Sequence, residues 1–297
     1  MSSALDTFIR SYSSYSSYLW NTITHPFDGT NYFTLLIGVS LIAWAIEYLI
    51  PWRKEQNIIR KDFWLDAFYM FFNFYIFNLL IFVALSNTSA QLFGKAMNFI
   101  GLPQDHIFDL TFLPTWAQFI LYFLIYDFIS WSVHNLLHRV PFLWRFHKLH
   151  HSVVEMGFAA HLRYHFVENF LYKSAIYISV AYLLNFKIEY VFFMHAGAIL
   201  IGHLNHTNVG WDYGPLKYLL NNPKMHIWHH AKDLPKSHPK GMNFGISLSL
   251  WDYLFKTDYI PYDGRDIALG FENVENYPSN FFQQQIEPFI ESSKSEK

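Results

Sequence analysis

Long apolar runs alternate with shorter polar segments along the chain. Residues 32–50 form an apolar run long enough to span a membrane, interrupted near its end by a single carboxylate, Glu47. Two further runs of this kind cover residues 64–86 and 115–133, and the last of them contains Asp127. The pattern predicts three long transmembrane helices.

Two more apolar segments, 169–184 and 190–204, are too short to be ordinary spans. They are separated by polar residues at Asn185, Lys187 and Glu189. We therefore expect a shallow helical hairpin that enters the membrane and returns to the same face.

Basic residues indicate which side of the membrane the loops occupy. The loop after the first span contains four of them, and the segment after the third span contains three: Arg53, Lys54, Arg60 and Lys61, then Arg139, Arg145 and Lys148. Loops rich in Lys and Arg tend to stay in the cytoplasm. The two assignments agree, because a chain that leaves through the second span and returns through the third reaches the same face. The sequence thus predicts that the segments after the third span, and the C-terminus, are cytoplasmic.

The pattern divides the chain into four expected parts. Residues 1–30 are an N-terminal lead-in, 31–114 hold transmembrane helices and their loops, 115–257 form a histidine-rich domain, and 258–297 form a C-terminal cytoplasmic tail. The lead-in lacks a basic region followed by an apolar core, so it does not read as a secretory signal. We expect it to be a surface or interfacial segment. The fold class predicted is an all-α integral membrane protein with a cytoplasmic helical cap.

Composition narrows the function. The chain is 52% hydrophobic and 15% charged, with a formal net charge of -2, so it carries no basic field for nucleic acid. It has no cysteine, which excludes disulfides, thiolate metal sites and thiol nucleophiles. Any metal site has to be built from histidine or carboxylate ligands.

Histidines are concentrated in the second half of the chain. Thirteen of the 16 lie between positions 134 and 230. His134 and His138 are four residues apart, which places them on one face of a helix. The motif HxxHH occurs twice, as HKLHH at 147–151 and HIWHH at 226–230. On a helix the three histidines of such a motif fall within an arc of roughly 100°, so each motif is expected to aim three imidazoles the same way.

The segment GHLNH adds two more histidines, and Asn222 followed by Pro223 is typical of a helix start just before the second HxxHH motif. Neutral imidazole is a good ligand for iron, zinc, copper and nickel. Eight or more clustered imidazoles are too many for one ion. The predicted metal ligands are His134, His138, His147, His150, His151, His203, His206, His226, His229 and His230.

The remaining histidines and three carboxylates are not predicted to bind metal directly. Lone histidines near a membrane interface are more often hydrogen-bonded side chains than ligands, which applies to His25, His106, His195 and His238. The roles of His161 and His165 stay open. Candidate acceptors for the second ring nitrogen of a ligand are Asp127, Glu155 and Glu168.

These motifs together resemble the fatty acid hydroxylase superfamily, also called the sterol desaturase family. The resemblance covers roughly residues 120–257 and rests on the order HNLLH, LWRFHKLHHS, NHTN, NPKMHIWHH and NFGISLSLWDYLF. It implies a membrane-embedded, all-helical enzyme with a non-haem di-iron centre. Such an enzyme uses O2 and externally supplied electrons to hydroxylate or desaturate a lipid, either an acyl, an alkyl or a sterol chain. His206 matches the histidine of a short family element, and Arg163, His165 and Glu168 match a segment between the boxes.

Several points remain open at this level. No dinucleotide, flavin or cytochrome b5-like haem segment is apparent, so a separate donor is expected: a reductase, a cytochrome b5-like or a ferredoxin-like protein. A zinc-dependent membrane hydrolase and a membrane metal carrier or sensor are the alternatives. The lipid substrate, the choice between alcohol and alkene as product, and the oligomeric state are not predicted.

Overall fold

The computed structural model describes residues 3–27, 31–78, 83–103, 106–177, 184 and 188–295. In these ranges the regular elements are helices, apart from two isolated antiparallel bridges, Leu220 with Leu248 and Ala231 with Leu269. The α-helices are α1 (Ala4–Thr24), α2 (Tyr32–Leu49), α3 (Phe63–Phe71), α4 (Val83–Phe99), α5 (Thr115–Arg139), α6 (Pro141–His147), α7 (Phe166–Tyr177), α8 (Ile188–His206), α9 (Pro223–His229), α10 (Leu250–Phe255) and α11 (Phe281–Ser295). The all-α prediction is confirmed for this part of the chain.

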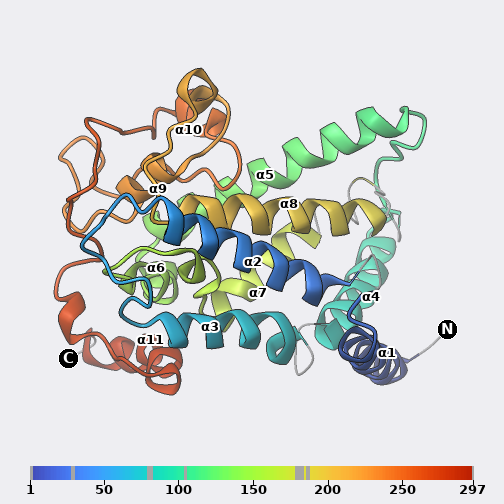
Figure 1. Ribbon diagram of the computed structural model, residues 1–297. Coiled ribbons are helices and arrows are strands. Elements are labelled where there is room, and N and C mark those ends of the chain that lie inside the picture. The colour runs from blue at the N-terminus through green and yellow to red at the C-terminus, as the bar shows by residue number, and fades with distance from the viewer. Residues whose placement is uncertain are drawn as a thin grey trace.

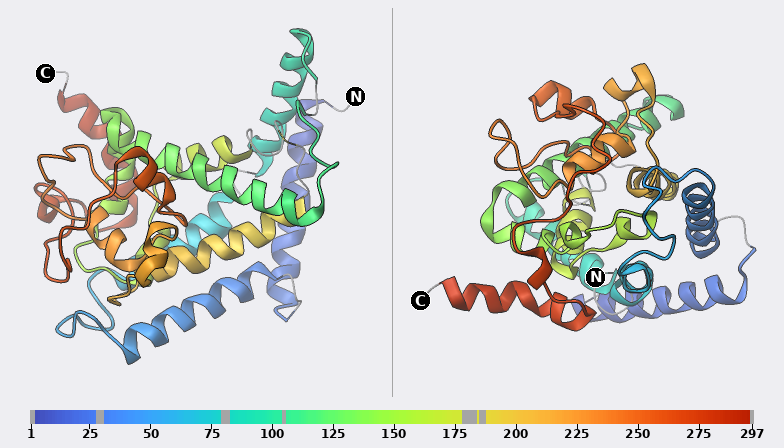
Figure 2. Two further views of the ribbon diagram at one scale, coloured as in Figure 1. Left: turned by 90° about the horizontal axis from the view of Figure 1, so that it is seen from above. Right: turned by 60° about the vertical axis from the view of Figure 1, so that its left-hand side comes forward.

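Helices α2, α5 and α8 run alongside one another, and the short helices gather at one end of them (Figure 1). That end holds α6, α9 and α10, with α11 below them, and forms a helical cap. At the other end α1 packs against α4 and crosses the ends of the long helices, as Figure 2 shows from above. The lead-in therefore contains a regular helix, which begins with a capping box between Ser3 and Asp6.

Two described helices, α2 and α5, are long and apolar enough to cross a membrane. On α2, Leu41 and Ile42 are more than half exposed, at 56% and 57%. Contiguous apolar exposure of this kind is unfavourable in water and suits contact with lipid. Two of the three expected spans therefore have matching helices.

The expected second span, residues 64–86, has a different form. Helix α3 is followed by a π-helical turn at Phe72–Ile76, and residues 79–82 lie outside the described part. Helix α4 then runs across the direction of α3 (Figure 1). A single straight span at 64–86 is thus not confirmed. Helices α7 and α8 occupy the two arms of the expected hairpin, and its turn falls on residues outside the described ranges.

Buried carboxylates hold the cap loops onto the long helices. Glu47, at the end of α2, accepts hydrogen bonds from the backbone N–H groups of Phe158 (2.7 Å) and Asn208 (3.0 Å). Asp127, in the middle of α5, accepts from the backbone N–H groups of Ser247 and Leu248. A buried carboxylate that receives several N–H groups offsets much of its desolvation. These contacts fix the loops that carry the histidine segments relative to α2 and α5.

Candidate metal centre

The last turn of α5 supplies the first pair of histidines. His134 and His138 lie one helical turn apart and both point into the cap, as the four-residue spacing predicts. Pro141 then starts α6, whose last residue is His147. The chain continues in a 3-10 turn over His150–Ser152. The HKLHH motif is therefore divided between the end of an α-helix and a tighter turn.

The second HxxHH motif begins on a capped helix. The Asn222 side chain accepts a hydrogen bond from the backbone N–H of Met225 (3.0 Å), and Pro223 occupies the first turn, so this predicted helix start is confirmed. Helix α9 ends at His229, which leaves His230 just beyond it.

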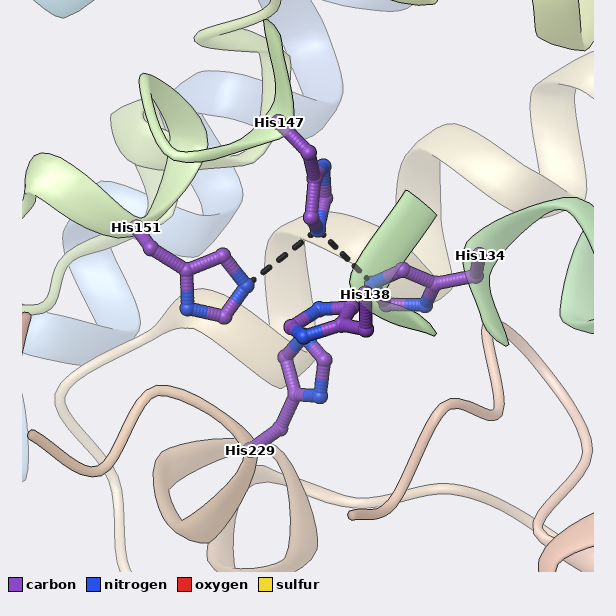
Figure 3. A group of neighbouring side chains, drawn as sticks. All are labelled: His134, His138, His147, His151 and His229. Carbon is purple, nitrogen blue, oxygen red and sulfur yellow. Dashed lines mark hydrogen bonds between the residues drawn. The ribbon is translucent and has the colours of Figure 1, made fainter. Parts of the chain in front are cut away.

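Nine of the ten predicted ligands form two compact groups. One ring nitrogen from each member lies within 4.8 Å of those of the others in its group. The first group, drawn in Figure 3, consists of His134, His138, His147, His151 and His229. The second group consists of His150, His206, His226 and His230. His138 is partly exposed, and the other eight are buried.

The expectation that each HxxHH motif aims all three imidazoles the same way is wrong. His147 and His151 belong to the first group, whereas His150 belongs to the second. The other motif has the reverse distribution, since its outer pair joins the second group and its middle histidine, His229, joins the first. Each motif thus gives an i, i+4 pair to one group and its middle member to the other. Two copies of the motif build two neighbouring groups, which explains the repetition.

Hydrogen bonds made by Nδ1 determine which ring nitrogen carries the proton in two histidines of the first group. His134 Nδ1 lies 2.8 Å from the carbonyl oxygen of Phe244, and His229 Nδ1 lies 2.8 Å from that of Met242. A carbonyl oxygen can only accept, so both Nδ1 atoms carry the proton. In a neutral imidazole this leaves Nε2 as a lone pair that faces the group.

His147 shows the same arrangement with a carboxylate. Its Nδ1 lies 2.8 Å from Oε1 of buried Glu168, and its Nε2 lies 3.2 Å from Nε2 of both His134 and His151. With the Nδ1 atoms of His134 and His147 protonated, their Nε2 lone pairs face each other. Two lone pairs at this distance repel, and a cation between the rings removes the repulsion.

The second group places several ring nitrogens in mutual contact. His226 Nε2 lies 2.9 Å from His206 Nε2 and 3.1 Å from His230 Nε2. His206 Nε2 in turn lies 3.3 Å from His150 Nε2. His206 donates its Nδ1 proton to the carbonyl oxygen of Gly202 (2.7 Å), so its Nε2 is a lone pair. One ring nitrogen offers either a proton or a lone pair, and therefore cannot satisfy two such neighbours by hydrogen bonding.

Burial keeps these rings neutral. Desolvation, reinforced by the neighbouring imidazoles, holds the pKa well below its usual range for His147, His150, His151, His226, His229 and His230. Neutral rings are the form that binds metal. The donor set of both groups is imidazole, which suits iron, zinc, copper or nickel and fits poorly with magnesium or calcium. The residues present therefore fit two metal ions of the first kind.

His203 lies outside both groups. Its Nε2 is 3.0 Å from Ser40 Oγ on α2, and its Nδ1 is 2.8 Å from Nδ1 of His161. His161 and His203 thus form a separate buried pair beside the second group. The ligand roles of all ten residues remain predictions, and the geometry favours nine of them.

The remaining histidines also have positions of their own. His165 Nε2 lies 2.9 Å from the carbonyl oxygen of Gln285, so it donates to α11. His25 is exposed, and His238 contacts Ser237 and Tyr259 in a loop. The side chain of His195 lies outside the described residues.

One of the three candidate acceptor carboxylates contacts a histidine of the groups. It is Glu168, which contacts Nδ1 of His147. Glu155 instead accepts a hydrogen bond from the backbone N–H of Lys61 (2.8 Å), and Asp127 accepts from the loop at Ser247. The other acceptors are the backbone carbonyls of Gly202, Met242 and Phe244. Sequence reasoning missed them, because every residue has a carbonyl group and no side-chain type marks these three.

A small cavity adjoins both groups. Its volume is about 20 Å³, enough for one water-sized molecule. Imidazoles of both groups line it, together with His161, Tyr164, Tyr172, Gly202, Asn205 and Ile246. A small molecule in this cavity would lie beside both groups at once.

Comparison with known proteins agrees with the motifs. Residues 119–257 match the family model for fatty acid hydroxylase, and this match confirms the resemblance that the motifs indicated. An ornithine lipid hydroxylase, OlsE, from Rhizobium tropici is 32% identical over 183 residues, which are 62% of this chain and 54% of that protein. No solved structure matches the chain significantly.

Alkylglycerol monooxygenases are more distant relatives. The protein from Xenopus tropicalis is 28% identical over 142 residues, covering 48% of this chain and 30% of that protein. The protein from Homo sapiens is 27% identical over 161 residues, covering 51% of this chain and 32% of that protein. The chain thus spans about half the length of the first relative and about a third of the other two.

Proposed function

We propose that this chain, on the premise of its match to the fatty acid hydroxylase family, is a membrane-bound, O2-dependent oxidoreductase that hydroxylates or desaturates a lipid at a non-haem di-iron centre. The observation that carries the proposal is the pair of adjoining imidazole groups, whose inward ring nitrogens face one another and share one cavity. Two ions in contact with one small cavity suit the activation of O2 next to a substrate.

Nine histidines would hold the two ions. His134, His138, His147, His151 and His229 would hold one ion, and His150, His206, His226 and His230 the other. When bound, two redox-active ions, which we expect to be iron, supply the activation of O2 and the removal of hydrogen from an unactivated C–H bond. The backbone carbonyls and Glu168 fix the ring orientations, because each accepts the outer N–H of its histidine.

The substrate class follows from the relatives. The relatives include an ornithine lipid hydroxylase and alkylglycerol monooxygenases, which their names describe as lipid-oxidising enzymes. This similarity supports a lipid substrate for this chain. An ornithine lipid and an alkylglycerol are accordingly the first substrates to assay. Hydroxylation and desaturation both begin with loss of a hydrogen atom, so either product fits the site.

The arrangement in the membrane is also proposed. We infer that the chain is a multi-pass membrane protein whose histidine cap and C-terminus are cytoplasmic, as the basic residues suggest. A cytoplasmic cap can receive electrons from a separate reductase, cytochrome b5-like or ferredoxin-like protein. A reporter fused after Lys297 should then be found in the cytoplasm. A signal from the opposite side of the membrane would contradict this topology.

The alternatives have less support. A zinc hydrolase needs about three protein ligands at one ion, and the second group of four histidines would then be unexplained. A metal carrier would require ionisable residues along the spans, whereas Glu47 and Asp127 hold backbone N–H groups.

The test combines metal analysis with lipid analysis. Purified protein in lipid nanodiscs should contain about two irons per chain, a number resting on the ligand count. With a reductant it should consume O2 and yield a lipid that has gained one oxygen or lost two hydrogens, as measured by mass spectrometry. Lipid oxidation by protein free of iron would disprove the di-iron proposal, and O2-independent lipid cleavage by zinc-loaded protein would favour the hydrolase.

A further inference from the structure

A buried hydrogen-bond acceptor without a partner belongs to Asn205, one of the residues that line the cavity beside the two histidine groups. Asn205 is 3% exposed and lies on α8, next to the predicted ligand His206. Its side-chain nitrogen Nδ2 donates to the carbonyl oxygen of Ile246 (2.9 Å), and both residues line the cavity. Its side-chain oxygen Oδ1 has no hydrogen-bond partner among the described residues.

The orientation of this amide is determined by chemistry. The oxygen of Ile246 can only accept a hydrogen bond, so the nitrogen of Asn205 has to face it. Turning the amide over would set two oxygens against each other. The free group is therefore an acceptor, and a buried acceptor without a donor costs free energy.

A metal ion is an unsuitable partner for this oxygen. Carboxamide oxygens suit hard ions such as magnesium and calcium, whereas the imidazoles of both groups suit iron, zinc and copper. Saturated lipid chain is unsuitable too, because a methylene group donates no hydrogen bond. An O–H or N–H group would satisfy this oxygen, and the cavity that Asn205 lines has room for one group of that size.

We propose that Asn205 is a substrate-positioning residue, which accepts a hydrogen bond from a hydroxyl or amide N–H of the lipid next to the carbon to be oxidised. This inference rests on the proposed function and narrows its substrate class. The oxidised C–H bond belongs to the polar end of the lipid, such as a glycerol, an amino acid headgroup or an adjacent carbon. A methylene group deep in an acyl chain would leave the acceptor unsatisfied. Tyr164 and Tyr172, which also line the cavity, fit a polar rather than a purely aliphatic occupant.

The test measures binding without turnover. Protein loaded with redox-inert zinc is titrated with a hexadecyl glycerol ether that has free hydroxyls, and with the same lipid after methylation of both hydroxyls. A second pair consists of an N-palmitoyl ornithine ester, whose amide has a free N–H, and the same ester after methylation of that amide nitrogen. Wild-type protein should bind the donor lipid of at least one pair about tenfold more tightly than its methylated partner.

Two variants separate recognition from folding. Asn205→Leu and Asn205→Ala should bring that ratio close to one while the zinc content stays at the wild-type value. Ser130→Ala is the matched control, because Ser130 is also buried and bonds only to Tyr126 of its own helix, away from the cavity lining. This control should keep the wild-type ratio.

The outcomes distinguish this inference from the proposed function. Equal binding of both lipids in each pair by wild-type protein, or an unchanged ratio in both Asn205 variants, would overturn the role of Asn205 and indicate that its oxygen faces a buried water. Iron-loaded protein that oxidises lipid while showing equal binding would keep the proposed function and lose this inference. Discrimination that is lost in the Asn205 variants, without any lipid oxidation by iron-loaded protein, would support the hydrogen bond from the lipid to Asn205 and contradict the proposed function.

Discussion

His147 and Glu168 form a fully buried pair in which Nδ1 of the histidine lies 2.8 Å from Oε1 of the carboxylate. Burial raises the pKa of Glu168 well above its usual range. A metal ion bound by His147 would polarise the ring and strengthen this hydrogen bond. The pair therefore links the charge of the site to a side chain that does not itself contact the ion.

Replacing Glu168 should weaken metal binding. Glu168→Leu removes the acceptor of His147 and should lower metal affinity about 10- to 100-fold. Glu168→Gln keeps an amide oxygen that can accept, so its loss should be smaller. Competition with a chelator, followed by metal analysis, measures both. Glu155→Gln is the control because Glu155 contacts backbone at Lys61, and equal metal loss in all three variants would refute the role of Glu168.

Helix α8 offers two glycines for a matched comparison. A Cβ atom at Gly202 would lie 2.0 Å from Nε2 of His161, whereas one at Gly197 would have no atom within 4 Å. Gly202→Ala should therefore displace His161 from the cavity wall and destabilise the protein by about 1–3 kcal/mol. Gly197→Ala should stabilise it by about 0.4–1 kcal/mol, because alanine restricts the unfolded chain. Thermal unfolding in detergent measures the change in unfolding temperature of each variant. Equal changes in the two variants would contradict the packing at Gly202.

The sequence predicted which segments carry the histidines but not how they are shared. The i, i+4 spacing and the Asn222 cap are local features, and the structure agrees with both. The assignment of His150 and His229 to opposite groups could not be predicted. The expectation that the three histidines of a motif share one arc of roughly 100° holds only if the whole motif lies on one helix. Helices α6 and α9 end inside their motifs, at His147 and His229. The end of a helix depends on tertiary contacts of the following turn, which single-chain periodicity does not contain.

His203 illustrates a second limit. Its three-residue spacing from His206 is typical of neighbouring ligands on a helix. In the structure the ring contacts Ser40, more than 160 positions earlier in the chain. Long-range pairs of this kind arise from the packing of α2 against α8, for which no local signal exists.

Acid should weaken the attachment of α11. His165 donates from Nε2 to Gln285 and accepts at Nδ1 from the backbone N–H of Val167 (3.1 Å). Burial lowers the pKa of His165 to about 4, below its usual 6.5, so the unfolded state binds the proton more readily. The stabilisation is present above pH 6.5 and is lost as the pH falls towards 4, by up to about 3 kcal/mol. Limited proteolysis of α11 across this range measures the effect. His165→Gln should flatten the pH dependence, and an unchanged profile in that variant would assign it to other groups.

His150 and His238 provide the sharpest comparison of a predicted ligand with an ordinary histidine. His150 is the only member that HKLHH gives to the second group, where its Nε2 lies 3.3 Å from that of His206. His150→Ala should leave that ion with three imidazoles, so the site loses affinity and its redox geometry. His238 lies in a loop beside Ser237 and outside both groups. We expect His150→Ala to give near-zero lipid product and a lower iron content, and His238→Ala to match wild type, at equal protein levels in membranes. Comparable product from both variants would mean that HKLHH has a structural role and that the two groups are not a metal centre.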